Sequence, residues 1–178
     1  MRPTTGTPPP LPAGATFRIA IIVSRFNAPI TNSLRDAARA ALGEAGVAAT
    51  DLEEFSVPGA FELPQAARCA AKTGRFDAIV CLGCVIRGET PHFEYVASSA
   101  AQGVMAAAGD TGVPMAFGVL TTDTEDQARA RAGNNPGNKG REAAAAALEM
   151  AALFRRLGRP AAKGSSRPFG FTAGAGDA

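Results

Sequence analysis

The chain has 178 residues, of which 46% are hydrophobic and 19% are charged, and it contains 20 glycines but no tryptophan. This length predicts one domain with a core large enough to fold unaided, and the hydrophobic content excludes a largely disordered chain. The formal net charge is +2, yet residues 17–157 contain 14 basic and 15 acidic residues. Because nucleic-acid binding needs a basic surface on the folded domain, we exclude that class of function.

The two ends of the chain differ in composition from its body. Residues 1–16 form a proline-rich N-terminal extension without the apolar core of a secretory signal. Residues 158–178 are rich in glycine, serine, alanine and proline, so we expect a flexible C-terminal tail and a folded domain at 17–157. No apolar run reaches the roughly 18 residues of a membrane span, and the three cysteines are an odd, low count. We therefore expect a cytoplasmic protein with reduced cysteines and no membrane association.

Short apolar runs alternate with alanine-rich stretches along the body. The apolar runs predict four strands, at residues 17–23, 52–57, 76–83 and 113–121. Helical spacing of apolar residues predicts helices at 34–42, 63–72, 92–108, 124–132 and 139–157. This alternation predicts an α/β protein with a single doubly wound domain: a four-stranded parallel sheet with helices on both faces, a three-layer arrangement that is flavodoxin-like in kind.

Residues that simple turns do not need follow the predicted strands. In doubly wound sheets, ligands bind beyond the carboxyl ends of the strands. The links at 24–27, 57–62, 83–92 and 121–123 contain aromatic rings, carboxylates, hydroxyls and the only histidine of the chain. Phe26 and Phe61 can be core residues, but each lies in a polar link beyond a strand, which favours a wall against a flat ligand. We therefore expect the functional site at this edge of the sheet.

The link after the third predicted strand resembles a phosphate-binding P-loop in its spacing. Gly83, Gly88 and Thr90 match that pattern, but Glu89 stands where the P-loop needs lysine. A carboxylate there would repel the phosphates of a nucleoside triphosphate, so we exclude that chemistry. Two interpretations stay open. Either the segment binds one anion at the N-terminus of the following helix, or it is an ordinary loop in which Thr90 caps that helix.

His92 is predicted in the first turn of that helix, where an imidazole can act as a general acid and base near neutral pH. Its place at a strand end favours this role over that of a surface or capping residue. One histidine and three scattered cysteines do not form a zinc-binding set, so no metal is expected. Cys81 and Cys84 lie three apart on a strand and therefore point to opposite faces, which indicates two structural thiols rather than a redox pair.

Arg131 and Lys139 flank a loop at 132–138 that is rich in glycine and asparagine. This loop is either a helix–helix turn with solvated charges or a cationic clamp, since arginine binds phosphate in a bidentate manner. The chain has no G-x-G-x-x-G and no G-x-S-x-G motif. Neither a dinucleotide-binding fold nor a hydrolase nucleophile elbow is therefore supported.

Five segments, in order from about residue 17 to residue 157, resemble the lumazine synthase (6,7-dimethyl-8-ribityllumazine synthase) family. They are SRFN at 24–27, VPGAFELP at 57–64, VIRGETPHFE at 85–94, FGVLTT at 117–122 and RAG…GNKG at 131–140. The resemblance implies a transferase of riboflavin biosynthesis that needs no cofactor or metal. Its reaction condenses 5-amino-6-ribitylamino-2,4(1H,3H)-pyrimidinedione with 3,4-dihydroxy-2-butanone 4-phosphate and releases phosphate and water.

The same resemblance implies roles for individual residues. His92 is expected to be the general acid and base, Phe26 to stack on the pyrimidine ring, and Phe117 to close the pocket from a neighbouring subunit. The expected substrate-binding residues are Phe26, Asn27, Ala60, Phe61, Glu62, Cys84, Val85, Ile86, Gly88, Glu89, Thr90, Phe117, Arg131 and Lys139. Of these, Ala60 and Glu62 would hold the ribityl chain, and Gly88, Glu89, Thr90 and Arg131 would meet the phosphate.

Family membership also implies a homopentamer with active sites at the subunit interfaces. A decamer or a sixty-subunit shell stays open, as does riboflavin synthase as a pathway partner. Three alternatives compete with the enzyme: a degenerate relative that binds a lumazine or flavin, a structural shell protein, and a flavodoxin-like electron carrier. The last needs a phosphate loop rich in serine and threonine directly after the first strand, and residues 24–27 do not provide one. We further expect that positioning of the two reactants dominates catalysis and that His92 adds a smaller factor.

Overall fold

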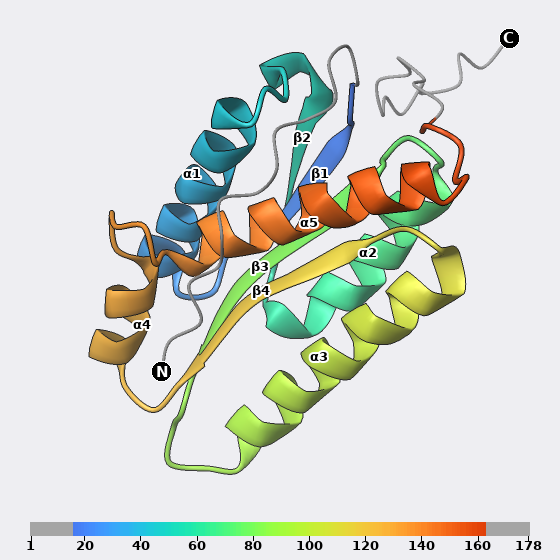
Figure 1. Cartoon of the computed structure of the whole chain (residues 1–178). Coiled ribbons are helices and arrows are strands. Elements are labelled where there is room, and N and C mark those ends of the chain that lie inside the picture. Colours follow the sequence, from blue (N-terminus) through green and yellow to red (C-terminus); the bar gives the residue numbers. More distant parts are fainter. Residues whose placement is uncertain (1–15, 163–178) are drawn as a thin grey trace, which may run out of the picture.

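Four parallel strands form the centre of the molecule (Figure 1). The computed structural model describes residues 16–162. The strands are β1 (Ile19–Ser24), β2 (Leu52–Val57), β3 (Ala78–Ile86) and β4 (Met115–Thr122). Their order across the sheet is β2-β1-β3-β4, and every neighbouring pair is parallel. The strand order reverses direction between β1 and β3, so the carboxyl ends of these two strands lie side by side. Doubly wound sheets bind their ligands in the crevice at such a point.

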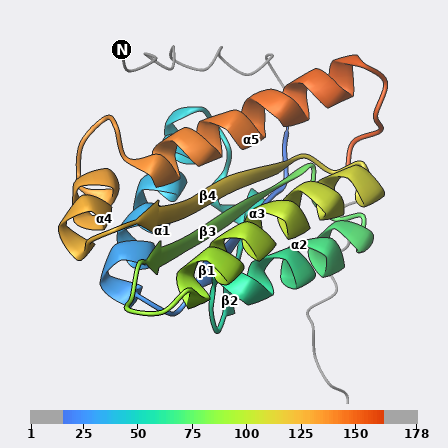
Figure 2. The same cartoon turned by 90° about the horizontal axis from the view of Figure 1, so that it is seen from below.

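Helices cover both faces of this sheet (Figure 2). The helices α1 (Ala28–Glu44) and α5 (Lys139–Arg156) pack on one face, with the short α4 (Glu125–Ala132) beside them. The helices α2 (Leu63–Lys72) and α3 (His92–Thr111) pack on the other. Two single turns, Ala49–Asp51 and Ala60–Glu62, precede β2 and α2. The predicted three-layer, doubly wound α/β fold is therefore confirmed.

Each strand contributes to two separate cores because alternate side chains point to opposite faces. Ile19 and Ile21 of β1 are buried against the layer of α1 and α5, whereas Ile22 is buried against the layer of α2 and α3. The same alternation places Cys84 in the first core and Cys81 in the second. The prediction that these two cysteines do not face each other is thus confirmed, and both thiols are free.

Small residues let the helices approach one another closely. A Cβ atom at Gly140 in α5 would lie 2.0 Å from the carbonyl oxygen of Leu34 in α1. A Cβ atom at Gly103 in α3 would lie 2.7 Å from the ring of Pro64 in α2. The alanine-rich composition of the helices follows from this close packing, since larger side chains would separate the layers.

Several predicted boundaries differ from the observed ones. The first helix begins at Ala28 rather than near residue 34, because Asn27 adopts a left-handed conformation (φ 59°) and a proline occupies the first turn, where no amide donor is needed. The third strand extends to Ile86, so the prediction that it ends at residue 83 was wrong. Cys84, Val85 and Ile86 are therefore strand residues, paired with Leu120, Thr121 and Thr122 of β4.

The chain after α5 turns back onto the body. The backbone amide of Ala162 donates a hydrogen bond to Asp77 Oδ1 at 3.0 Å, and Arg159 donates to the carbonyl oxygen of Asp77 at 3.2 Å. Residues 158–162 of the predicted C-terminal tail are thus in contact with the domain. The rest of that tail, 163–178, and residues 1–15 of the predicted N-terminal extension lie outside the described residues. Within 16–162, no helix is long and apolar enough to cross a membrane.

Candidate active site

A pocket of about 550 Å³ opens at the carboxyl edge of the sheet, where the sequence predicts the site. This volume suits a ligand of drug or metabolite size. The pocket walls come from the ends of β1, β2 and β3 and from the first turns of α3. The lining residues are Phe26, Asn27, Gly59, Ala60, Phe61, Glu62, Cys84, Val85, Ile86, Gly88, Thr90, His92, Phe93, Tyr95 and Val96.

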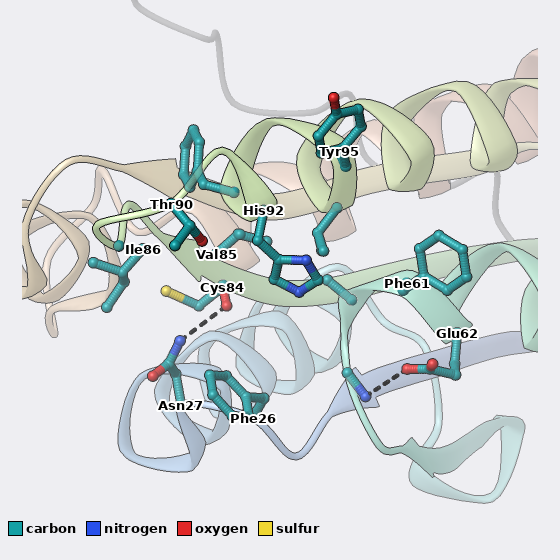
Figure 3. Close-up of a pocket in the computed structure, with 15 residues that line it drawn as sticks. Phe26, Asn27, Phe61, Glu62, Cys84, Val85, Ile86, Thr90, His92 and Tyr95 are labelled. Atoms are coloured by element: carbon teal, nitrogen blue, oxygen red, sulfur yellow. Dashed lines mark hydrogen bonds between the residues drawn. The ribbon is translucent and has the colours of Figure 1, made fainter.

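Two aromatic rings are exposed at this pocket (Figure 3). Phe26 is 71% exposed and Phe61 is 59% exposed, although rings of this size are normally buried in a folded chain. Two hydrogen bonds hold the backbone that carries the Phe26 ring. The amide of Arg25 donates to Val57 O at 2.8 Å, and the amide of Phe26 donates to Pro58 O at 3.1 Å. The links after β1 and β2 are therefore joined, and they present a flat apolar surface at the mouth of the pocket.

The turn before α2 is held by its own acidic side chain. Glu62 Oε2 accepts a hydrogen bond from the backbone amide of Gly59 at 2.9 Å (Figure 3). This closes the turn that carries Ala60 and Phe61. The second carboxylate oxygen, Oε1, accepts no hydrogen bond from the described residues, so it can receive a hydroxyl donor from a ligand.

A side-chain bond joins the ends of β1 and β3. The Asn27 amide nitrogen donates to the backbone carbonyl oxygen of Cys84 at 3.0 Å (Figure 3). Asn27 also caps α1 through its backbone oxygen, which accepts from the amides of Ile30 and Thr31. Asparagine suits this position because it tolerates a positive φ better than most other residues.

His92 is the first residue of α3, and its ring projects into the pocket (Figure 3). Tyr95 and Val96 follow at the i+3 and i+4 positions, on the same face of the helix. The N-cap of α3 is Pro91, which makes no side-chain capping bond. The interpretation of Thr90 as a helix cap was therefore wrong, and Thr90 faces the pocket instead. The start of α3 retains amide donors and a positive dipole end, which favour an anion.

The buried cysteines are unsuited to nucleophilic chemistry. Burial raises the pKa of the Cys81 thiol to about 12. Burial and the nearby carboxylate of Glu125 raise the pKa of the Cys84 thiol to about 11. Both thiols therefore stay protonated near neutral pH, and the thiolate is the reactive form. Among residues 16–162, no three histidine, cysteine or acidic side chains are grouped so as to hold a metal ion.

Four of the predicted site residues do not line the pocket of their own chain: Glu89, Phe117, Arg131 and Lys139. Phe117 lies on the edge strand β4 and is 40% exposed. Arg131 lies in the last turn of α4, and its side chain donates to the backbone oxygen of Gln127 at 2.9 Å. Lys139 forms an ion pair with Glu142 at 2.6 Å. All the other predicted site residues meet in the pocket.

The sequence prediction missed four lining residues: Gly59, Phe93, Tyr95 and Val96. Gly59 and Phe93 lie within the family-like segments 57–64 and 85–94, but the sequence assigned them no role. Tyr95 and Val96 could have been found from helical spacing, because a helix that begins at His92 must present them on the same face.

The pocket of this doubly wound α/β domain combines exposed rings, a histidine and a helix N-terminus, which is typical of an enzyme that acts on small molecules. The model of the 6,7-dimethyl-8-ribityllumazine synthase family matches residues 16–155, and the chain belongs to this family of transferases. A relative named 6,7-dimethyl-8-ribityllumazine synthase from Syntrophus aciditrophicus is 52% identical over 141 residues, which cover 79% of this chain and 92% of the relative. One of the same name from Salinibacter ruber is 52% identical over 140 residues, covering 79% and 90%.

Proposed function

We propose that this chain makes 6,7-dimethyl-8-ribityllumazine, the penultimate compound of riboflavin biosynthesis. It would do so by condensing 5-amino-6-ribitylamino-2,4(1H,3H)-pyrimidinedione with 3,4-dihydroxy-2-butanone 4-phosphate, with release of phosphate and water. The observation that carries this proposal is the pocket itself. One half of it offers exposed rings and a carboxylate, and the other half offers a histidine beside a helix N-terminus.

The pyrimidine substrate fits the half of the pocket formed by the links after β1 and β2. Phe26 would stack on the flat ring, and the strand residues Val85 and Ile86 would line its edge. The ribityl chain would run along the turn at 60–62, where the free oxygen of Glu62 accepts hydroxyl donors. Asn27 and Cys84 complete this wall.

The phosphate of the second substrate fits the start of α3. Gly88 permits close approach of the backbone, Thr90 offers a hydroxyl, and the helix dipole favours the anion. Arg131 is proposed as the counter-charge, with Glu89 and Lys139 nearby. In support, Arg131 lies within 4.0 Å of no carboxylate among residues 16–162, whereas most arginines of the domain are paired.

His92 would move protons between the two bound reactants. The pyrimidine amine attacks the ketone, and loss of water gives an imine. Elimination then expels the phosphate, and the ribityl nitrogen closes the ring with a second loss of water. Each step shifts a proton, and a histidine between the two substrates can accept and return it. Holding both reactants in one pocket removes an entropic barrier worth up to about 7–11 kcal/mol, so positioning is proposed as the larger contribution.

The pocket is proposed to be completed by a neighbouring subunit of a homopentamer. Phe117 supports this, because its ring is partly exposed on an edge strand although it does not line its own pocket. Tyr95 and Met105 of α3 are 71% and 76% exposed, which is typical of a surface that a partner covers. Phe117, Arg131 and Lys139 would then reach the pocket of the next chain. Riboflavin synthase as a pathway partner also belongs to this proposal, as does a cytoplasmic location, which the free cysteines support.

A turnover assay on the purified protein tests the proposal. Fluorescence of the lumazine and release of phosphate are followed together with both substrates present. We expect the two products to appear at equal rates. Arg131→Ala should raise KM for the butanone phosphate, whereas Arg129→Ala, on the same helix, should not. No product from folded wild-type protein would overturn the proposal, and lumazine binding without phosphate release would identify the binding-protein alternative.

A further inference from the structure

Arg87 lies in the VIRGETPHFE segment beside the pocket, and neither the sequence nor the proposed reaction assigns it a role. It follows directly on β3, and its backbone amide donates to Thr122 O at 2.8 Å, which extends the pairing with β4 by one residue. Its side chain then leaves the sheet and contacts two other elements. This side chain therefore lies where the strand, the link after β4 and the start of α3 meet.

Three contacts hold the guanidinium group. Nε donates to Asp123 Oδ1 at 2.8 Å, in the link between β4 and α4. Nη1 donates to Glu94 Oε1 at 3.2 Å, in the first turn of α3. The guanidinium carbon lies 4.5 Å from the ring centroid of Phe93, which itself lines the pocket. Arg87 directly precedes residues 88–91, and its side chain contacts Phe93 and Glu94 in the helix that follows them. One side chain therefore connects the two ends of this segment.

The segment between these ends has little else to hold it. Gly88, Glu89 and Thr90 are exposed and make no hydrogen bond with other described residues. Its one backbone bond at the helix end runs from the amide of Glu94 to Pro91 O at 3.0 Å. The conformation of this segment therefore depends on how firmly the end of β3 and the start of α3 are held relative to each other.

We infer that Arg87 is a positioning residue that fixes residues 88–91 in the conformation that binds the phosphate of the second substrate, without itself contacting that phosphate. This inference rests on the proposed function, in which the segment and the start of α3 meet the phosphate. The carboxylates of Asp123 and Glu94 already offset the single positive charge of Arg87, which makes it a poor counter-charge for a phosphate. Its Glu94 bond also neutralises a carboxylate in the helix turn that would otherwise repel an anion.

A charge role and a positioning role predict opposite effects for Asp123→Ala. If Arg87 attracted phosphate through its charge, loss of Asp123 would free that charge and remove a negative one, and phosphate would bind more tightly. If Arg87 acts by holding the segment, loss of Asp123 removes one anchor, and phosphate binds more weakly. Because all three side chains are substantially exposed, these ion pairs contribute little to the stability of the fold, and the variants should remain folded.

The experiment measures KM for each substrate, kcat and the melting temperature for wild type, Arg87→Ala, Arg87→Lys and Asp123→Ala. Binding of inorganic phosphate is measured by calorimetry on the same proteins. Arg129→Ala is the matched control, because it removes an exposed arginine–carboxylate pair from α4 at a site away from the pocket.

We expect Arg87→Ala to raise KM for the butanone phosphate and Kd for phosphate by about tenfold, with KM for the pyrimidine and the melting temperature unchanged. Arg87→Lys should recover only part of this loss, because lysine cannot bridge two carboxylates in a fixed plane. Asp123→Ala should weaken phosphate binding by about threefold. Tighter phosphate binding in Asp123→Ala, or equal effects of Arg87→Ala on both substrates, would overturn the inference. If wild type binds phosphate but makes no lumazine, the proposed function fails while the calorimetric comparison still decides the role of Arg87.

Discussion

The side-chain amide of Asn27 donates a hydrogen bond to the backbone carbonyl oxygen of Cys84, with 3.0 Å between nitrogen and oxygen. This bond joins the ends of β1 and β3, the two central strands of the sheet. It holds the link that carries Phe26 against the strand end that carries Val85 and Ile86. Asn27, whose backbone is left-handed, thus ties together the two strand ends that border the pocket.

Variants at Asn27 separate its backbone role from its side-chain role. Asn27→Gly tolerates the positive φ of this position but lacks the side-chain donor. Asn27→Asp tolerates the positive φ less well, and it places a carboxylate against the backbone oxygen of Cys84. We expect both to raise KM for the pyrimidine by about fivefold, the equivalent of one hydrogen bond of about 1 kcal/mol, with the larger effect in Asn27→Asp. Steady-state kinetics with the pyrimidine varied measures this. An unchanged KM in Asn27→Asp would show that the bond does not shape the pocket.

Removal of the His92 ring should slow the reaction without abolishing it. For His92→Ala we expect kcat to fall by about 10- to 100-fold, at or below the low end of the range for general acid–base catalysis, while KM for both substrates changes little. Single-turnover measurements of lumazine fluorescence, with and without added imidazole, test this. Complete loss of turnover with both substrates still bound would mean that positioning is not the main contribution.

Gly140 should be indispensable to the packing of α5 on α1. A methyl group there would lie 2.0 Å from the Leu34 carbonyl oxygen, so Gly140→Ala must separate the helices and is expected to destabilise the fold by about 3 kcal/mol. Gly43→Ala in α1 is the control, because a methyl group there meets no atom within 4 Å and should stabilise the helix by about 0.5–1 kcal/mol. Urea denaturation compares the two. Equal stability of both variants would refute this account of the packing.

Stability should fall in alkaline solution because of the buried thiols. The pKa of Cys84 is about 11 in the folded chain, raised from 9.0, so the folded chain keeps a proton that the unfolded chain loses first. The contribution to stability is complete below pH 9 and is lost as the pH rises from 9 through 11. We expect the free energy of unfolding of wild type to fall more between pH 8 and pH 10.5 than that of Cys84→Ala. Cys69→Ala, which alters an exposed thiol, should behave like wild type.

The fold could be predicted because its pattern is local. The apolar runs reveal strands of a sheet covered on both faces, the spacing of small apolar residues reveals the helices, and the strand ends then locate the pocket. The errors arose at boundaries that long-range pairing decides. Cys84 to Ile86 continue as a strand only because β4 lies alongside to pair with them. The early start of α1 depends on the left-handed Asn27, whose conformation its bond to Cys84 supports.

The site could be predicted in part, for a similar reason. His92 and Phe26 stand out because the only histidine of the chain and an aromatic ring lie in polar links at strand ends, and both line the pocket. No role for Arg87 could be predicted from the sequence, because its inferred role depends on contacts with Asp123 and Glu94. These residues lie 36 and 7 positions further along the chain, and no local pattern links them to Arg87. Phe117 and Arg131 do not line the pocket of one chain, so the local geometry alone does not explain them.

Subunit mixing tests most directly the claim that the pocket of one chain is completed by its neighbour. His92→Ala and Arg131→Ala proteins are each assayed alone, by lumazine fluorescence and at low butanone phosphate, and then co-assembled in equal amounts. Light scattering first establishes the assembly, which for a homopentamer has five times the chain mass of 18.1 kDa. If each pocket takes His92 from one chain and Arg131 from the next, about one interface in four is complete, and activity should rise to about a quarter of wild type. Activity no greater than the mean of the two parent proteins would contradict a site shared between subunits.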